Sequence, residues 1–498
     1  MKYISKIAFL GLAGLLSLSG CVEQPEEYLT EIDPAVFEPK PFDIDNYSDT
    51  YGGIASWQFS FQWGPYNLHD PSIVKGDDGW YYCYSTDVAY GQSIRPGIMV
   101  RKSQDLVDWK FVGQAIDGLP QQAVDYIEGK GATANEGIWA PYIMKVGGEY
   151  RLYYSLASDG FRVSAIGLLT ASSPEGPWVE KGLAVVSETD GPGTNAIDPT
   201  VVVTPAGDHY MYYGSAWDGL FVVQLDPATG LAATAGDKGK LIVRRGQTDG
   251  MYNGNLEGPE IIYNKEHDKY YLFVAYDWLA TKYNVRVFRA DSPEGPFLDW
   301  DGVPADEPHD NNAPMILAPY AFEGHAGWQG TAHCSVFEGV DGEYFMANQG
   351  RPVVDPAAMV MHVRKVMWTE EGWPMVSPER YANVPNDPVT KEELVGSYDQ
   401  LLNLYTTVPG YGNEQTDPGI NGSFISNLLA DGTINGDPNN TWEYNAPWLE
   451  LKWANGAFID KMHVSRERDW ERKISSTVVM TGFNGGGLSI WFKKRPVE

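Results

Sequence analysis

The chain has 498 residues, of which 13% are aromatic, and its 66 acidic and 36 basic residues give a formal net charge of −30 at pH 7. So large an excess of negative charge excludes nucleic acid and anionic membrane surfaces as electrostatic partners. Only three cysteines are present, which excludes a fold organised by disulfides.

The N-terminus resembles a bacterial lipoprotein signal. Lys2 and Lys6 precede an apolar stretch at 7–18 that is too short to span a bilayer, and the sequence LSGC follows. This pattern predicts removal of residues 1–20 and a lipid on Cys21. We therefore expect membrane attachment through an N-terminal lipid anchor, on a bacterial outer membrane and exposed at the cell surface.

An acidic, proline-containing tether is predicted at residues 21–50, because such a composition does not bury enough apolar surface to fold. Residues 51–390 then contain five similar segments. In each, an anchor residue is followed by an apolar run, a Gly/Asp turn and an aromatic run, and the anchors are Pro71, Pro141, Pro199, Pro259 and Cys334.

Each segment predicts a β-hairpin, and further strand-like runs bring every interval to about four strands. Repeats of this length and content are typical of propeller blades, whose first strands meet at a central axis. The sequence therefore predicts an all-β fold with a five-bladed β-propeller over 51–390.

Three of the five segments carry a carboxylate just before the anchor, namely Asp70, Asp198 and, one residue earlier in its segment, Glu257. Acidic groups that share one cleft repel each other, which raises at least one pKa and separates an acid from a base. This division suits glycoside hydrolysis. Asp-Pro is also a common turn pair, but three in register favour function. Glu260 is a rival for the acid, because NLEGPE contains two glutamates.

Over about residues 60–385 the chain resembles glycoside hydrolase family 43, and within it the endo-α-1,5-L-arabinanases. The segments that carry the resemblance are NLHDPSI, IWAPYI, SAIGLLTASSPEGPW, NAIDPTVV, YYGSAWDGLFVVQLDPATG, NLEGPEIIY, RVFRADSPEGPF, GTAHCSVF and HVRKVMWTEEGWPMVSPERY. The resemblance implies Asp70 as general base, Glu257 as general acid and Asp198 as the residue that orients the acid and tunes its pKa, in a single displacement with inversion.

The resemblance also implies a calcium ion beside His333. Taken alone, a histidine between Ala332 and Cys334 is more typical of a packed core, and calcium prefers oxygen ligands. The sequence departs from the family pattern in the context of His333 and at Tyr142, where an acid is commoner.

Aromatic side chains near predicted strand ends are candidates for stacking on sugar rings, with core packing as the alternative. Trp139 and Trp217 are the substrate-binding candidates, and Trp278 occupies a similar place. Cys83 and Cys334 fall in the first and last segments, and the sequence leaves open whether they pair.

Residues 391–498 differ in character and predict a small β-barrel or sandwich of short strands separated by Asn/Gly/Asp turns. They resemble the lipocalin-like domain that follows some arabinanase propellers. Its tryptophans would pack against the propeller or bind glycans, and packing is favoured. These are Trp442, Trp448, Trp453, Trp470 and Trp491.

The expected function is hydrolysis of internal α-1,5-L-arabinofuranosyl bonds in arabinan, a side chain of pectin. One alternative is an exo-acting arabinofuranosidase or xylosidase of the same family. Another is a surface lipoprotein that binds glycans without cleaving them, although a pure binder has no need for three mutually repelling carboxylates. The sequence does not determine the oligomeric state.

Overall fold

The computed structural model describes residues 42–190, 193–248, 251–252, 255–307, 313–339, 342–405 and 419–497. The predicted signal at 1–20, Cys21 and most of the predicted tether therefore lie outside the described residues. Within these ranges the fold is all-β, with one α-helix, α1 (Gln121–Gly129), and the short 3-10 helices η3 (Ile44–Asn46), η4 (Gly52–Ile54), η5 (Trp57–Gln62) and η7 (Glu392–Leu394). No helix in the described ranges combines the length and apolarity needed to cross a membrane.

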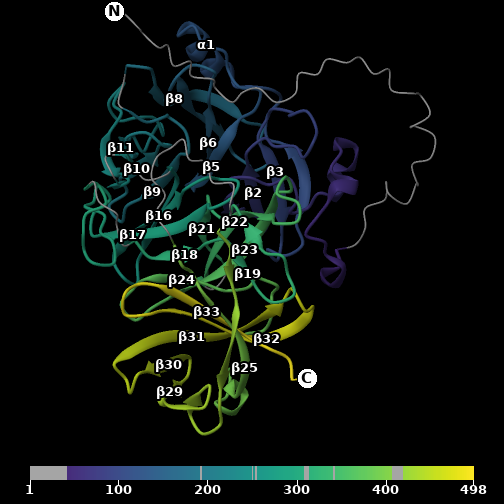
Figure 1. The fold of residues 1–498 in the computed structure, drawn as a ribbon. Coiled ribbons are helices and arrows are strands. Elements are labelled where there is room, and N and C mark those ends of the chain that lie inside the picture. The colour runs from purple at the N-terminus through teal and green to yellow at the C-terminus, as the bar shows by residue number, and fades with distance from the viewer. Residues whose placement is uncertain are drawn as a thin grey trace, which may run out of the picture. The chain divides into compact units, whose positions relative to one another are not determined.

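Four separate antiparallel sheets of four strands each make up most of the propeller, and in every one the strands lie side by side in chain order (Figure 1). The first holds β1 (Ser72–Lys75), β2 (Tyr81–Ser85), β3 (Met99–Ser103) and β4 (Lys110–Gln114), and the second holds β5 (Trp139–Val146), β6 (Glu149–Leu156), β7 (Ser164–Ala171) and β8 (Val179–Ser187). The third holds β9 (Thr200–Val203), β10 (His209–Tyr213), β11 (Leu220–Leu225) and β12 (Lys240–Val243), and the fourth holds β15 (Leu256–Asn264), β16 (Lys269–Tyr276), β17 (Asn284–Ala290) and β18 (Met315–Leu317). A two-stranded hairpin, β13 (Gln247–Thr248) and β14 (Met251–Tyr252), precedes the fourth sheet.

The fifth segment differs from the expectation of a five-bladed propeller, because the described residues form four separate four-stranded sheets and not five. Its strands β21 (Ser335–Glu338), β22 (Tyr344–Pro352), β23 (Val360–Trp368) and β24 (Pro374–Val376) belong to a seven-stranded sheet with β20 (Trp328–Gln329), β19 (Tyr320–Ala321) and β26 (Asn421–Gly422). The reason is strand length. The short β21 pairs with β22 only as far as Ala347, and β20 covers the edge of β22 beyond it, at Arg351 and Pro352.

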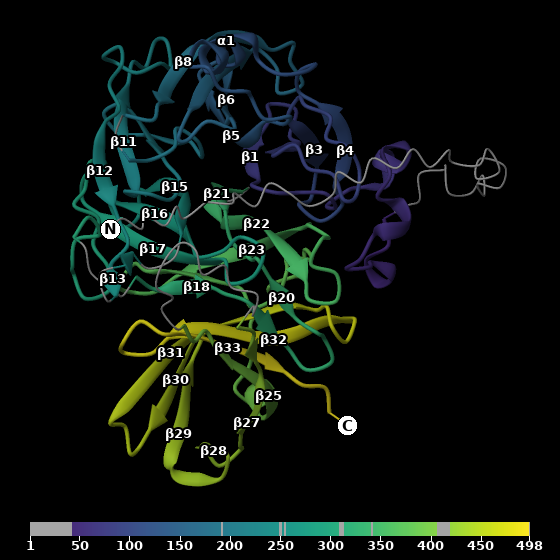
Figure 2. The same ribbon diagram turned by 45° about the horizontal axis from the view of Figure 1, so that its top comes forward.

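Apolar side chains fill the spaces between neighbouring sheets, because successive residues of a strand point to opposite faces. On β5, Ile143 packs toward the first sheet while Met144 packs toward the third, and Leu152 and Tyr153 on β6 divide in the same way. Ile73 and Cys83 of the first sheet pack against Phe345 and its neighbours in the seven-stranded sheet. The third and fourth sheets share an apolar core in the same way, as do the fourth and the seven-stranded sheet, so the sheets pack around a closed circle (Figure 2).

The inner strands are also joined by a ring of hydrogen bonds. In each case the side chain that follows an anchor residue on one inner strand bonds to the backbone of the next inner strand. The five contacts are Ile143 N–H to Ser72 Oγ (3.0 Å), Tyr142 O–H to Val201 O (2.7 Å), Ile261 N–H to Thr200 Oγ1 (3.3 Å), Val336 N–H to Glu260 Oε1 (2.8 Å) and Ile73 N–H to Ser335 Oγ (3.2 Å). We call these five side chains the axial ring. They link β1, β5, β9, β15 and β21 and return to β1.

The C-terminal residues form a closed eight-stranded barrel, which confirms a β-barrel rather than a sandwich. Its strands are β25 (Gly396–Leu402), β27 (Phe424–Leu428), β28 (Thr433–Ile434), β29 (Asp437–Asn445), β30 (Trp448–Trp453), β31 (Phe458–Asp469), β32 (Ile474–Phe483) and β33 (Ser489–Lys494), and β33 pairs with β25 to close it. Trp442 lies in the barrel interior, whereas Trp491 packs against Tyr320 of the seven-stranded sheet. Trp491 therefore packs against the propeller, as expected, whereas Trp442 belongs to the core of the barrel itself.

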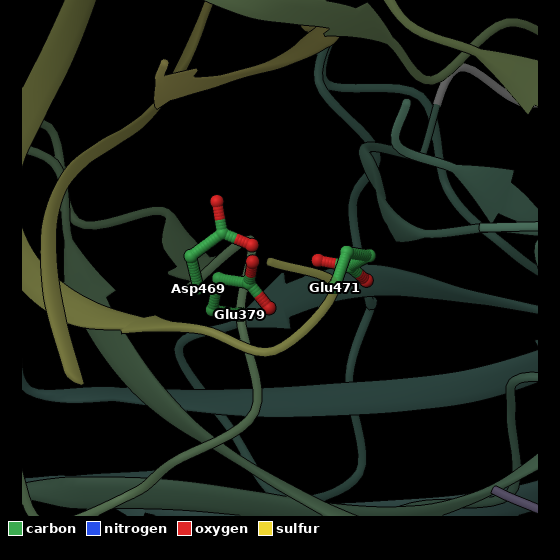
Figure 3. A group of neighbouring side chains, drawn as sticks. All are labelled: Glu379, Asp469 and Glu471. Atoms are coloured by element: carbon green, nitrogen blue, oxygen red, sulfur yellow. The ribbon is translucent and has the colours of Figure 1, made fainter. Parts of the chain in front are cut away.

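A buried charge cluster lies where the barrel follows the propeller. The carboxylates of Glu379, Asp469 and Glu471 point toward one another (Figure 3), close enough to hold a metal ion. The fully buried Lys493 of β33 bonds to all three, with its Nζ 2.7 Å from Glu379 and 3.1 Å from Asp469. The lysine ammonium therefore supplies the positive charge that these carboxylates need.

Glu260 offers a test of the axial ring. Replacement by leucine leaves the Val336 N–H and the Thr200 hydroxyl without their buried acceptor. Each lost partner costs about 1–3 kcal/mol, so we expect the free energy of unfolding in urea to fall by about 2–6 kcal/mol. Glu260→Gln should retain most of it, and the exposed Glu266→Leu in the same hairpin serves as the control. A Glu260→Leu protein as stable as this control would contradict the role of the ring.

Candidate active site

The residue before each anchor adopts a left-handed backbone conformation. The φ values are 52° at Asp70, 35° at Ala140, 59° at Asp198, 55° at Gly258 and 50° at His333. Residues with a β-carbon avoid this region, and such strain clusters at functional sites. Of the four positions that carry a β-carbon, three have ionisable side chains, namely Asp70, Asp198 and His333, which is where the sequence predicted the site.

Asp70 is held between two histidines. Its Oδ1 lies 2.8 Å from His69 Nδ1 and 3.0 Å from His333 Nδ1, and its Oδ2 accepts a 2.6 Å hydrogen bond from Thr86. Burial disfavours the charged carboxylate, but His333 and His69 outweigh it and hold the pKa of Asp70 well below its usual range. Asp70 is therefore an ionised carboxylate at neutral pH.

Asp198 has the opposite charge state. It is 6% exposed, and its Oδ2 accepts a 3.1 Å hydrogen bond from the Gly258 N–H. Burial, together with the charges of Glu257 and Asp70, outweighs the opposing effect of His333 and raises the pKa of Asp198 to about 8. At neutral pH this carboxyl therefore carries a proton.

Glu257 lies at the start of β15 and is only half-buried, so it is accessible from solvent. The pairing of β15 with β16 shifts register between Glu257 and Glu260, which is a β-bulge. Gly258 is needed in this bulge, because a β-carbon there would lie 2.9 Å from His333 Nδ1. Glu257 accepts hydrogen bonds from Tyr283 O–H (2.7 Å) and Ser215 O–H (2.8 Å), which fix its orientation.

Glu260, the rival for the acid, lies elsewhere. It is 5% exposed and its two oxygens accept hydrogen bonds from Thr200 and Val336 within the axial ring. Burial raises its pKa to about 7. Glu260 is thus buried and occupied in joining inner strands, whereas the half-exposed Glu257 is the one of the two that a substrate could reach.

His333 supplies the positive charge of the site. Burial opposes protonation, but Asp70 and, to a smaller extent, Asp198 and Glu257 raise the pKa of His333 to about 9. An imidazolium beside Asp70 therefore compensates part of the negative charge that three carboxyl groups would otherwise concentrate on the axis.

The predicted aromatic residues differ in exposure. Trp217, in the loop between β10 and β11, is 39% exposed and lies edge-on to Phe161, which is 53% exposed, with ring centroids 4.9 Å apart. Trp139 and Trp278 are half-buried. Cys83 and Cys334 are both buried free thiols.

Several residues that contact the acids were not among the predicted site residues. His69 and Ser215 stand inside the quoted motifs NLHDPSI and YYGSAWDG, so adjacency to a predicted site was the available signal. Tyr283 comes from the loop between β16 and β17 of the sheet that carries Glu257, and Phe161, which contacts Trp217, comes from a loop of the second sheet. No local pattern marks either residue.

Comparison with known proteins agrees with this geometry. Residues 64–374 match the family described as glycosyl hydrolases family 43, and residues 378–492 match a C-terminal lipocalin-like domain. The extracellular endo-α-(1→5)-L-arabinanase of Thermotoga petrophila is 27% identical over 492 residues, covering 88% of this chain and 95% of that protein. A crystal structure of an endo-1,5-α-L-arabinanase from Thermotoga petrophila RKU-1 gives a TM-score of 0.73 at 25% identity, covering 88% of this chain and 99% of that one.

A second relative is named for a different activity. The extracellular exo-α-(1→5)-L-arabinofuranosidase ArbA of Cellvibrio japonicus is 27% identical over 323 residues, which cover 62% of this chain and 86% of that protein. The family expected from the motifs and the lipocalin-like character of the C-terminal domain are thus confirmed.

The raised pKa of Asp198 has a consequence for stability. Between pH 3.8 and about 8 the folded protein keeps a proton that the unfolded chain releases, so this residue makes the protein less stable as the pH rises through that window. Asp198→Asn removes the effect. We expect the variant to gain at least about 1.4 kcal/mol over wild type between pH 4 and pH 8. Calorimetry across this range checks it, with the exposed Asp208→Asn as control; parallel wild-type and variant curves would contradict the assignment.

Proposed function

This chain belongs to family 43 of the glycosyl hydrolases, and we propose that it cleaves internal α-1,5-L-arabinofuranosyl bonds of arabinan with inversion. The observation that carries the proposal is the contrast between the carboxyl groups of Asp70 and Asp198. Histidines hold the first ionised, burial keeps the second protonated, and hydroxyl groups orient Glu257 beside them.

In this mechanism Asp70 is the general base. As the oxygen of a water molecule attacks the anomeric carbon, Asp70 takes a proton from that water. The bond between the anomeric carbon and the leaving sugar's oxygen breaks, and Glu257 gives its proton to that oxygen. Because the water enters opposite the leaving group, the configuration inverts.

Asp198 orients and tunes the acid. Its bond to the Gly258 N–H places it against the backbone that carries Glu257. The carboxyl groups of Asp198 and Glu257 repel each other when both are charged, so a proton is favoured on the pair at neutral pH. This shared proton rests on Asp198 in the free enzyme, and in the proposed step it reaches the leaving oxygen through Glu257.

Endo action is favoured over exo action by the extent of the similarity. The endo-acting relative and the endo-arabinanase structure both extend over 88% of the chain, whereas the exo-acting relative extends over 62%. A glycan-binding protein without activity is disfavoured, because it gains nothing from a strained backbone at Asp70 and Asp198. Trp217 and Phe161 are the proposed platform for a sugar ring, with Trp139 nearer the axis.

The division of the chain into a propeller at 51–390 and a barrel-like domain at 391–498 is part of the proposal, with β21–β24 of the seven-stranded sheet acting as the fifth blade. The closed axial ring supports this reading, since β21 occupies the same place in it as the four other inner strands.

A lipid on Cys21 and a position on the outer membrane, facing the medium, complete the proposal. The charged start, apolar stretch and LSGC sequence support it, and such a position suits a polysaccharide substrate too large to enter the cell. The mass of the mature protein extracted from membranes tests the anchor.

Product analysis on linear arabinan tests the proposed activity. Wild type should release mixed oligosaccharides early, with the β-anomer of the new reducing end appearing first in NMR spectra. Glu257→Gln should lower the rate by about 10²–10⁴-fold, because the leaving oxygen loses its proton donor. Glu266→Gln, exposed on the same sheet, is the matched control. Arabinose as the sole early product would establish exo action instead, and binding without release would establish the non-catalytic alternative.

Calcium beside His333 is a further part of the proposal. The described side chains offer an imidazole and the Asp70 carboxylate, with Nδ1 and Oδ1 3.0 Å apart, whereas calcium takes six to eight oxygen ligands. These residues fit a weakly held ion whose remaining ligands are water. When bound, the ion would supply the positive charge beside Asp70 that the imidazolium otherwise carries.

Metal removal checks this part. Dialysis against a chelator should lower arabinanase activity, calcium but not magnesium should restore it, and His333→Ala should abolish the response. Metal analysis should find about one calcium per wild-type chain. Full activity after chelation, with no calcium in the protein, would leave His333 itself as the charge beside Asp70.

A further inference from the structure

Tyr405 belongs to the C-terminal part of the chain but lies among residues of the fourth propeller sheet and its loops. It follows β25, the first barrel strand, by three residues. Its hydroxyl donates to Asp277 Oδ1 (3.2 Å) and accepts from Arg245 Nη2 (2.9 Å). The guanidinium of Arg286 lies 3.9 Å from the centre of its ring. A tyrosine thus offers both a hydroxyl and an aromatic face to two arginines.

The charged residues around Tyr405 are buried, so their geometry matters. The side chains of Arg245 and Asp277 are 4% and 2% exposed, and Arg245 Nη1 lies 3.2 Å from Asp277 Oδ1. A buried ion pair is stable only when the remaining donors and acceptors are satisfied. The Tyr405 hydroxyl therefore gives the Arg245–Asp277 ion pair a hydrogen-bond partner that the propeller does not supply.

The pair holds the backbone on one side of Glu257. Arg245 Nη1 donates to the carbonyl of Asn255 (3.1 Å), which also accepts the Asp277 N–H (3.0 Å). Asn255 stands two residues before Glu257. Motion of Arg245 would thus move the segment from which the proposed acid projects.

The same pair holds the other side of Glu257. Asp277 Oδ2 accepts a 2.9 Å hydrogen bond from Asn284 Nδ2. Asn284 directly follows Tyr283, whose hydroxyl bonds to Glu257. Asp277 therefore connects the strand that carries Glu257 with the loop that orients its carboxyl group.

A second contact from the C-terminal part lies on the same loop. A β-carbon built at Gly419 would be 3.0 Å from Lys282 Cε, so the backbone of Gly419 packs directly on the residue before Tyr283. Tyr405 and Gly419 flank residues 406–418, which lie outside the described ranges. Two separate described positions of the C-terminal part thus meet the loop at 277–284.

We propose that Tyr405 is a positioning residue for Glu257, and that the C-terminal part of the chain thereby completes the catalytic site. Tyr405 acts through Arg245 and Asp277 and touches neither the acid nor the substrate. The inference rests on the proposed function for its kinetic consequence, but the structural coupling holds whatever the substrate.

Tyr405→Phe in the full chain tests the proposal with two readouts. It keeps the ring over Arg286 and removes the hydroxyl. Tyr444→Phe is the matched control, because the Tyr444 hydroxyl donates to Val389 O (3.0 Å), away from the propeller site. In hydrogen exchange followed by mass spectrometry, we expect segments 255–258 and 281–284 to exchange about fivefold faster in Tyr405→Phe, and segments of the first two sheets to remain unchanged.

The kinetic readout separates positioning of the acid from general damage. On linear arabinan, kcat should fall about tenfold with KM unchanged, because the leaving oxygen depends on a well-placed proton donor. On a 4-nitrophenyl arabino-oligoside, whose leaving group needs little protonation, kcat should fall less than about twofold.

An equal loss of kcat on both substrates would overturn the positioning role. So would hydrogen exchange that is faster in all sheets, or hydrogen exchange in Tyr405→Phe that is identical to wild type. A wild-type protein inactive on arabinan would instead refute the proposed function. The exchange experiment would then still decide whether Tyr405 holds the segments around position 257.

Discussion

The axial ring is the constraint on which the rest of the structure depends. A propeller brings its inner strands together at the axis without pairing them, so their edges need other partners. Here one side chain per strand bonds to the backbone of the next strand, from Ser72 around to Ser335, and the last contact returns to Ile73. Buried backbone groups are thus satisfied where no sheet continues.

The carboxyl groups of the site depend on this ring because they stand just before its members in the chain: Asp70 and Asp198 by two residues, and Glu257 by three. The anchor between them follows a left-handed residue in every strand. The ring fixes the strand, the strained backbone fixes the residue before the anchor, and Asp70, Asp198 and His333 are thereby held within range of one another's charge. Their different pKa values follow from this proximity and from unequal hydrogen bonding.

The sequence was informative where a single residue type, here proline, determines the local backbone geometry. Proline anchors with an acid beside them predicted both the repeat and the positions of Asp70 and Asp198. The expectation of a fifth separate four-stranded blade was wrong because it depended on strand length, and no residue in the fifth segment signals that β22 extends beyond its pairing with β21. The Glu257–Glu260 ambiguity also needed the structure, since a β-bulge changes which residue is half-exposed.

Contacts between distant segments were beyond prediction for another reason. Tyr283 reaches Glu257 from a loop, and Tyr405 reaches Arg245 from 160 positions along the chain. Each is an ordinary tyrosine in its local sequence. Their roles arise only in the tertiary fold, which brings the Tyr283 hydroxyl to the Glu257 carboxylate and the Tyr405 hydroxyl to Arg245 and Asp277.

The shared core at Trp300, Trp373 and Phe483 bears on how such chains diverge. Trp300 stacks on Trp373 of the propeller and packs against Phe483 of the barrel, and Trp491 lies in the same core. Although the two family matches meet between residues 374 and 378, the apolar side chains on either side of that junction are mutually buried. A recombination event that exchanged one part would expose tryptophan surface on the other. In this chain the two parts therefore share one core, and a substitution on one side of it must be accommodated by the side chains on the other.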